Sequence, residues 1–149
     1  MSPATLVIGA GNELRRDDGA GLAAVQRLRS AGLEVLEAGC DLALLVRLWE
    51  GRDRVIIVDA VRTGAAVGTL HRFDARVGPL PAVFARGSTH SFGVAEAVEL
   101  ARVLGRLPAS LVLYGIEGGD FSPGEGLSPE VEQAVDTAAA RIAHEVRLA

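Results

Sequence analysis

The sequence predicts a three-layer α/β fold built on a mostly parallel sheet. Short apolar runs alternate along the chain with segments in which apolar residues recur at helical spacing. The run Val55 to Val58 is apolar at every position, as in a central strand that is buried on both faces. A glycine-rich turn from Gly9 to Gly21 joins the first strand to the first helix. Alternating strands and helices of this kind place helices on both faces of a parallel sheet.

Each predicted element follows from its own pattern. Strands are expected at about residues 5–9, 33–37, 54–60, 69–73 and 110–115, and the fourth is the most exposed because polar and apolar residues alternate in it. Helices are expected at about residues 18–31, 42–50, 92–105 and 129–146. Gly32 ends the first helix, Asp41 is a suitable N-cap for the second, and Ser128 followed by Pro129 opens the last.

Length and composition favour one domain spanning residues 1–149. The net charge is -4 and the sequence has no stripe of basic residues, so nucleic acid is not expected as a partner. All 15 basic residues are arginines, which excludes lysine catalysis, and the single cysteine, Cys40, excludes an internal disulfide. Neither a signal peptide nor a membrane span is recognisable, so a cytoplasmic protein is expected.

The glycine-rich turn does not fit a nucleotide site. The dinucleotide fingerprint requires glycine where the chain has Leu14, and the Walker pattern requires a lysine. Asp17 and Asp18 stand at the expected mouth of the first helix, where a phosphate would meet negative charge. Two explanations therefore remain open at this point: the aspartates cap the helix, or they bind a cation.

Three ligand-type residues are expected at the same edge of the sheet. Asp18 follows the first strand, Asp59 ends the third, and His90 opens the helix that leads to the fifth. Two carboxylates and an imidazole suit a divalent metal such as nickel, zinc or manganese and leave coordination positions open. Taken one at a time, Asp59 and His90 are also compatible with simple capping roles.

The other chemically active side chains give weaker signals. Cys40 has no adjacent base and is expected to be a small packing residue, and Ser88 and Ser91 lack the surroundings of a serine nucleophile. His71 and His144 are expected to face solvent. The segment 117–127, which carries Glu117, Asp120 and Glu125, is expected to be a solvated, mobile loop.

The chain as a whole resembles the hydrogenase maturation endopeptidases. The resemblance is carried, in order, by Gly9-x-Gly11-Asn12, Asp17-Asp18-Gly19-x-Gly21, Val58-Asp59-Ala60, His90-Ser91-x-Gly93 and Gly126-Leu127-Ser128-Pro129-Glu130-Val131. It implies a sheet in the order 2-1-3-5-4 with the fourth strand antiparallel, and metal ligation by Asp18, Asp59 and His90. The chain departs from the family after the fifth strand, where Gly115 to Asp120 lacks a proline that is common in relatives.

The resemblance implies cleavage of a C-terminal peptide from the nickel-loaded precursor of the nickel-iron hydrogenase large subunit. The resemblance also implies that the nickel belongs to the substrate and serves for recognition, and zinc or cadmium is expected to replace it in vitro. An aspartate acts as the base, as in an aspartic-type peptidase, or the metal assists as a Lewis acid. The alternatives are a non-catalytic nickel-sensing or chaperone-like module and a metallohydrolase with its own metal.

Overall fold

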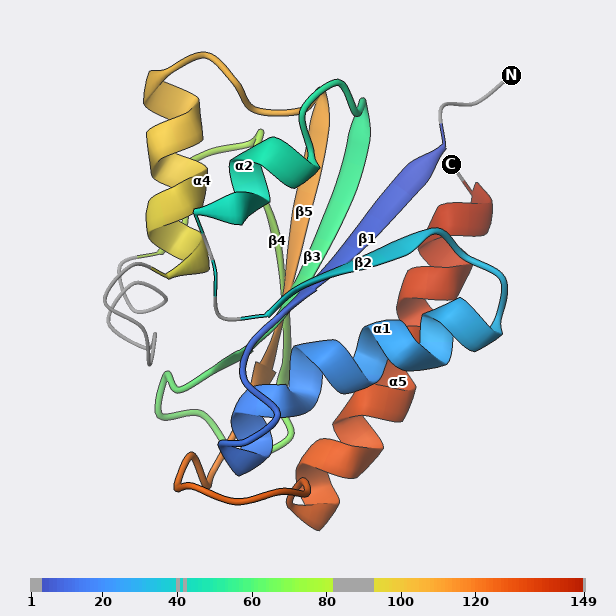
Figure 1. Ribbon diagram of the computed structural model, residues 1–149, viewed down its shortest axis with the longest axis vertical. Coiled ribbons are helices and arrows are strands. Elements are labelled where there is room, and N and C mark those ends of the chain that lie inside the picture. The colour runs from blue at the N-terminus through green and yellow to red at the C-terminus, as the bar shows by residue number, and fades with distance from the viewer. Residues whose placement is uncertain (1–3, 40, 42, 82–92, 149) are drawn as a thin grey trace.

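Five strands form one mixed sheet in the computed structural model, which describes residues 4–39, 41, 43–81 and 93–148 (Figure 1). The strands are β1 (Thr5–Ala10), β2 (Val35–Gly39), β3 (Arg54–Val61), β4 (Leu70–Asp74) and β5 (Ser110–Glu117). Their order is β2-β1-β3-β5-β4, and only the β4–β5 pair is antiparallel. The predicted fold class and strand order are therefore confirmed.

The helices begin and end somewhat differently from the sequence prediction. The 3-10 helix η1 (Arg16–Gly19) precedes α1 (Ala20–Ser30), and the others are α2 (Leu44–Leu48), α4 (Val94–Val103) and α5 (Pro129–Leu148). The prediction of Asp41 as a side-chain cap was wrong. No side chain caps α2, and the carbonyl oxygen of Asp41 accepts a hydrogen bond from the Leu44 N–H instead.

Helices cover both faces of the sheet. In Figure 1, α1 and α5 lie together on one face, and α2 and α4 lie on the other. One buried cluster joins α1 and α5 to the sheet through residues such as Val25, Val58 and Ile142. A second cluster on the opposite face includes Ile57, Trp49 and Val98. The apolar run of β3 contributes side chains to both clusters, which is why it lacks the alternation of apolar and polar residues that a half-exposed strand shows.

Glycine lets α1 approach the sheet closely. A methyl group at Gly21 would overlap the carbonyl oxygen of Val58 and lie 2.5 Å from that of Ala10. A methyl group at Gly9 would lie 2.7 Å from the Gly21 carbonyl oxygen. Backbone therefore contacts backbone where α1 crosses β1 and β3, and this holds η1 against the carboxyl ends of both strands.

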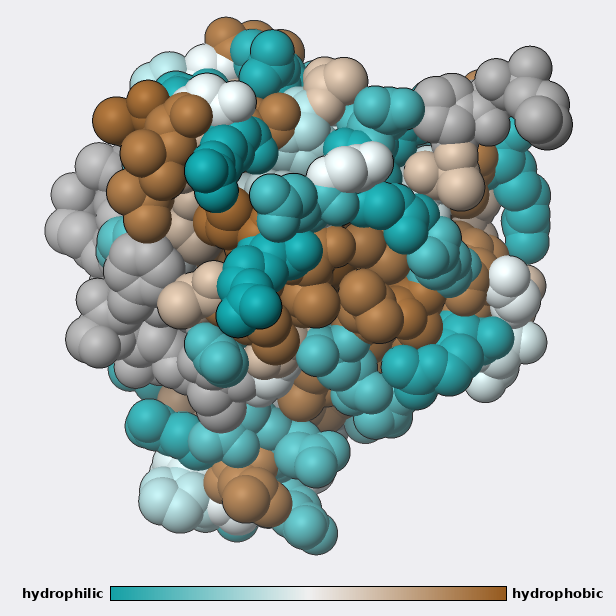
Figure 2. Space-filling view, turned by 45° about the horizontal axis from the view of Figure 1, so that its top comes forward, coloured by the Kyte–Doolittle hydropathy of each residue, from teal (hydrophilic) through white to brown (hydrophobic). Residues whose placement is uncertain are grey.

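Among the described residues, three exposed apolar side chains, Leu100, Val103 and Leu104, lie near the C-terminal end of α4. Figure 2 shows apolar surface there and a larger apolar area near the middle of this face, bordered by polar side chains. Val103 is 83% exposed and Leu104 56% exposed. Among the described residues, no helix is both long enough and apolar enough to cross a membrane.

Candidate functional site

The carboxyl ends of β1 and β3 bring two buried aspartates together. Asp18 lies in η1, directly after the β1 turn, and is 1% exposed. Asp59 lies near the end of β3, where it pairs with Gly115 of β5, and is 9% exposed. The Asp18 carboxylate accepts a hydrogen bond of 3.0 Å from the Asn12 N–H, and that of Asp59 accepts one of 2.9 Å from the Ala60 N–H. The juxtaposition that the sequence predicts for this pair is therefore present.

The two aspartates repel each other electrostatically. Burial and the nearby charge of Asp18 together raise the pKa of Asp59 to about 7, although the Ala60 N–H lowers it slightly. Asp59 therefore exchanges a proton near neutral pH. A divalent cation between the carboxylates would relieve the repulsion, so the donor chemistry of the pair fits a metal ion.

Gly11 allows the first loop to close over this pair. Its φ of 128° lies in the region that only glycine adopts readily. A methyl group at Gly11 would overlap the carbonyl oxygen of Asp18 and would lie 3.8 Å from the Oδ1 atom of Asp59. The glycine is thus required for the approach of β1, η1 and β3.

Asp17, the neighbour of Asp18, has a structural role. Its carboxylate is fully buried and accepts hydrogen bonds from the N–H groups of Gly119, Asp120 and Ser128 and from the Ser128 hydroxyl, at 2.7 to 2.9 Å. Burial alone would raise the pKa of Asp17, but these hydrogen bonds outweigh it and lower the pKa below its ordinary value. Asp17 therefore connects the first loop to the segment between β5 and α5.

The helix-capping explanation of the acidic pair is not supported. No side chain caps α1, whose N-cap residue is Gly19. Asp17 binds a distant segment, and Asp18 binds the backbone of the preceding turn at Asn12. The two adjacent aspartates thus differ in function: one holds a loop and the other faces Asp59.

The expectation that Glu117 and His71 face solvent was wrong. Glu117 is the last residue of β5 and only 1% exposed. Its carboxylate accepts hydrogen bonds from the Thr63 N–H and hydroxyl, at 2.7 and 2.6 Å, and from the Gly64 N–H at 3.3 Å. It also lies 3.0 Å from the Nε2 atom of His71. This cluster holds the β3–β4 loop against the same edge of the sheet.

One sequence signal could have located Glu117. It directly follows the apolar run from Leu111 to Ile116, just as Asp59 follows the run of β3. A carboxylate at the end of a buried strand is a candidate for burial in both cases. The prediction for Asp120, Glu125 and His144 is confirmed, since all three are exposed.

The third predicted ligand, His90, lies outside the described residues, as do Cys40, Ser88 and Ser91. Metal ligation by Asp18, Asp59 and His90 therefore stays a prediction. Within residues 4–39, 41, 43–81 and 93–148, no group of three His, Cys, Asp or Glu side chains is arranged to hold a metal ion.

Comparisons with known proteins agree on one family. The model of a family described as hydrogenase maturation protease matches residues 23–145. The hydrogenase 2 maturation protease of Escherichia coli K12 is 31% identical, and the match covers 89% of this chain and 84% of the relative. A putative hydrogenase maturation protease of Methanocaldococcus jannaschii is 34% identical over 95% of this chain and 96% of the relative.

Solved structures show the same fold. The hydrogenase maturating endopeptidase HybD of Escherichia coli superposes with a TM-score of 0.80 at 29% identity, covering 97% of this chain and 92% of that one. The nickel-iron hydrogenase maturation protease HybD of Thermococcus kodakarensis gives a TM-score of 0.75 at 30% identity, covering 96% and 98%.

Proposed function

Because this chain belongs to the hydrogenase maturation protease family, we propose that it is the endopeptidase that removes the C-terminal peptide of a nickel-iron hydrogenase large-subunit precursor. The observation that carries the proposal is the buried pair Asp18 and Asp59 at the carboxyl edge of the sheet. In parallel α/β sheets, this edge is where ligands bind.

Asp18, Asp59 and His90 recognise the nickel ion of the precursor in this proposal. The support from the described residues is electrostatic, since burial and, after it, the charge of Asp18 raise the pKa of Asp59, and a cation would oppose both effects. Three protein ligands leave coordination positions that groups of the precursor can keep. The nickel is thus part of the substrate, and an enzyme without metal of its own is expected to be competent.

Asp59 is the proposed general base. The pKa of about 7 belongs to the pair without a cation, and substrate nickel would lower it, so the Asp59 carboxylate is ionised at neutral pH in the complex. One carboxylate oxygen can bind nickel while the other accepts a proton from water as the water oxygen attacks the scissile carbonyl carbon. The same proton is then donated to the leaving amine as the C–N bond breaks, and the carboxylate is restored. Substrate nickel near the carbonyl oxygen would polarise that bond and assist the same step.

The test is a processing assay on precursor purified with and without nickel. Wild type is expected to shorten only the nickel-loaded precursor, and Asp18→Asn, Asp59→Asn and His90→Ala are each expected to abolish processing while the fold persists. Asp53→Asn is the matched control, because Asp53 is an exposed aspartate next to the opposite end of β3.

Each alternative gives a different result in this assay. Equal cleavage of nickel-free precursor would contradict recognition through nickel. Retention of nickel-loaded precursor without cleavage would indicate a chaperone-like module. Stoichiometric metal in the purified protein, required for activity, would indicate a metallohydrolase.

A further inference from the structure

The edge of the sheet at β4 is open on one side. The Ala75 N–H donates to the Leu111 carbonyl oxygen of β5 at 2.9 Å. Along an antiparallel pair, residues whose backbone groups bond to the partner strand alternate with residues whose backbone groups point away from it. The backbone N–H and C=O groups of Leu70 and Arg72 therefore point away from β5. No further strand of the described residues pairs with this edge.

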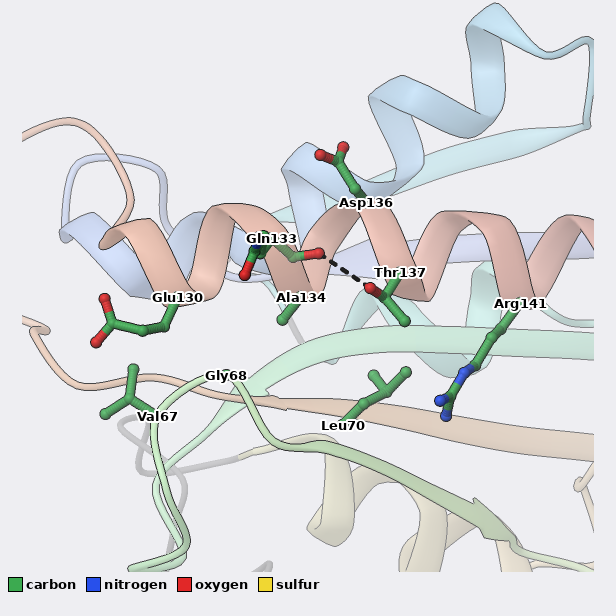
Figure 3. Close-up of a pocket in the computed structure, with 9 residues that line it drawn as sticks. All are labelled: Val67, Gly68, Leu70, Glu130, Gln133, Ala134, Asp136, Thr137 and Arg141. Atoms are coloured by element: carbon green, nitrogen blue, oxygen red, sulfur yellow. Dashed lines mark hydrogen bonds between the residues drawn. The ribbon is translucent and has the colours of Figure 1, made fainter.

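A groove follows the open edge between β4 and α5. A cavity of about 580 Å³ is lined by Val67, Gly68 and Leu70 on one side and by α5 on the other. In Figure 3, the side chains of Val67 and Leu70 point toward α5. A second cavity of about 500 Å³ continues along α5 past Arg72, and Arg141 lines both cavities.

The groove begins near the buried acid pair. A methyl group at Gly119 would lie 2.8 Å from the side chain of Val67, and the Gly119 N–H donates to Asp17 at 2.9 Å. Asp17 directly precedes Asp18 in the chain. Gly119 therefore links the Val67 end of the groove to the loop that carries Asp17 and Asp18.

The two ends of the groove carry opposite charges. Glu130 lies at the end near Val67, and Arg141 lies eleven residues further along α5, about 16 Å away at helical rise. Neither forms an ion pair within the described part of the chain, whereas Arg72 is bound to Glu145 at 2.9 Å. The groove between them is lined by the apolar side chains of Val67, Leu70 and Ala134 and by polar side chains of α5. The polar ones are Gln133, Thr137 and Asp136, of which Asp136 is paired with Arg27 at 2.6 Å. An extended peptide of about five residues would span this distance.

We propose that this groove binds the part of the substrate that follows the scissile bond, as an extended strand added to the free edge of β4. The inference rests on the proposed function, because the occupant is the C-terminal extension of the precursor. Backbone hydrogen bonds to Leu70 and Arg72 hold the peptide, and the apolar floor takes alternate side chains. A basic group lies near Glu130, and an acidic side chain or the terminal carboxylate lies near Arg141.

The first test measures binding without cleavage. A synthetic peptide with the sequence of the C-terminal extension is added to the wild-type protein, and amide hydrogen exchange is followed. The amides of Leu70 and Arg72 are expected to become protected, while those of β2, the other edge strand, exchange as before. Binding that protects β2 or leaves β4 unchanged would overturn the proposal. Protection of β4 without peptide, growing with protein concentration, would assign the edge to a second copy of this chain and would also overturn it.

The second test uses matched variants in the processing assay. Arg141→Glu is expected to raise KM about fivefold with kcat unchanged. Arg147→Glu makes the same charge change on α5 outside the groove and is expected to leave KM unaltered. Arg72→Pro removes an outward N–H and is expected to raise KM above that of Arg72→Ala, which loses the ion pair but keeps the N–H. Thermal unfolding of all four variants verifies that they fold.

The two proposals fail separately. Absence of cleavage by the wild-type protein would contradict the proposed function. The amide hydrogen exchange experiment would then still show whether the peptide binds along β4. If the precursor is cleaved, equal KM values for Arg141→Glu and Arg147→Glu would contradict peptide binding in the groove, as would equal KM values for Arg72→Pro and Arg72→Ala. The proposed function would still stand.

Discussion

Asp17 and Ser128 form a double hydrogen bond across 111 residues of sequence: the backbone N–H and the hydroxyl of Ser128 each donate to the Asp17 carboxylate at 2.7 Å. This contact fixes the first residues of α5 beside η1. The loop after β5 is bound to the same carboxylate through Gly119 and Asp120. The position of Asp18 thus depends on a neighbour that has no contact with substrate in the proposed mechanism.

Asp17→Asn is expected to lower the free energy of unfolding by about 1–3 kcal/mol, because an amide cannot accept from all four donors. Asp18→Asn, one residue further, is the control and is expected to be at least as stable as wild type. The pKa of Asp17 is lowered in the fold, so its contribution is present above the ordinary pKa of 3.8 and is lost as the pH falls below it. Urea unfolding of both variants between pH 3 and pH 8 measures this. Equal stability of the two variants would show that Asp17 does not hold the loop.

Asp59→Asn is expected to stabilise the protein at neutral and alkaline pH. The folded pKa of about 7 lies above the ordinary 3.8, so ionisation costs folding free energy as the pH rises through this window. Relative to wild type, the variant should gain about 2–4 kcal/mol at pH 8 and almost nothing at pH 4. Thermal unfolding across this pH range, with Asp53→Asn as control, measures the difference. A variant less stable than wild type at pH 8 would instead identify Asp59 as a structural residue.

Glu117→Gln is expected to lower the free energy of unfolding by about 1–3 kcal/mol. The amide nitrogen of glutamine would face the N–H groups of Thr63 and Gly64 or the ring of His71, and one donor would lose its acceptor. Glu125→Gln is the control, because Glu125 is exposed in the nearby loop. Chemical denaturation compares the two, and amide exchange at residues 62–69 reports whether the β3–β4 loop opens first. No loss of stability in Glu117→Gln would show that the Glu117 carboxylate does not hold the β3–β4 loop.

Nickel, zinc or cadmium is expected to bind with donor atoms from Asp18, Asp59 and His90 at about 2.0–2.4 Å. Affinity should fall as the pH decreases below 7, because protons compete for Asp59. Anomalous scattering from a soaked crystal locates the ion, and calorimetry at pH 6 and pH 8 gives the pH dependence. Metal bound away from these side chains would show that the acid pair is not a metal site.

The sequence by itself determined the architecture and the location of the acid pair. Alternating apolar patterns identified five strands, and a strand buried on both faces identified β3 as central. Because parallel strands end at one edge, the residues that follow β1 and β3 were expected at the same edge of the sheet, and the strand order implied by the family resemblance made these two strands neighbours. Asp18 and Asp59 could therefore be paired before any coordinates were known.

Only the tertiary structure decided which polar residues at that edge hold the fold. Asp17 and Asp18 look alike in sequence, but Asp17 finds its donors at Gly119 and Ser128, more than 100 residues away. Glu117 seemed to be a loop residue because its partners, Thr63 and His71, come from another loop and an edge strand. A buried carboxylate is stable only where donors converge on it, and convergence from distant segments leaves no local periodicity in the sequence.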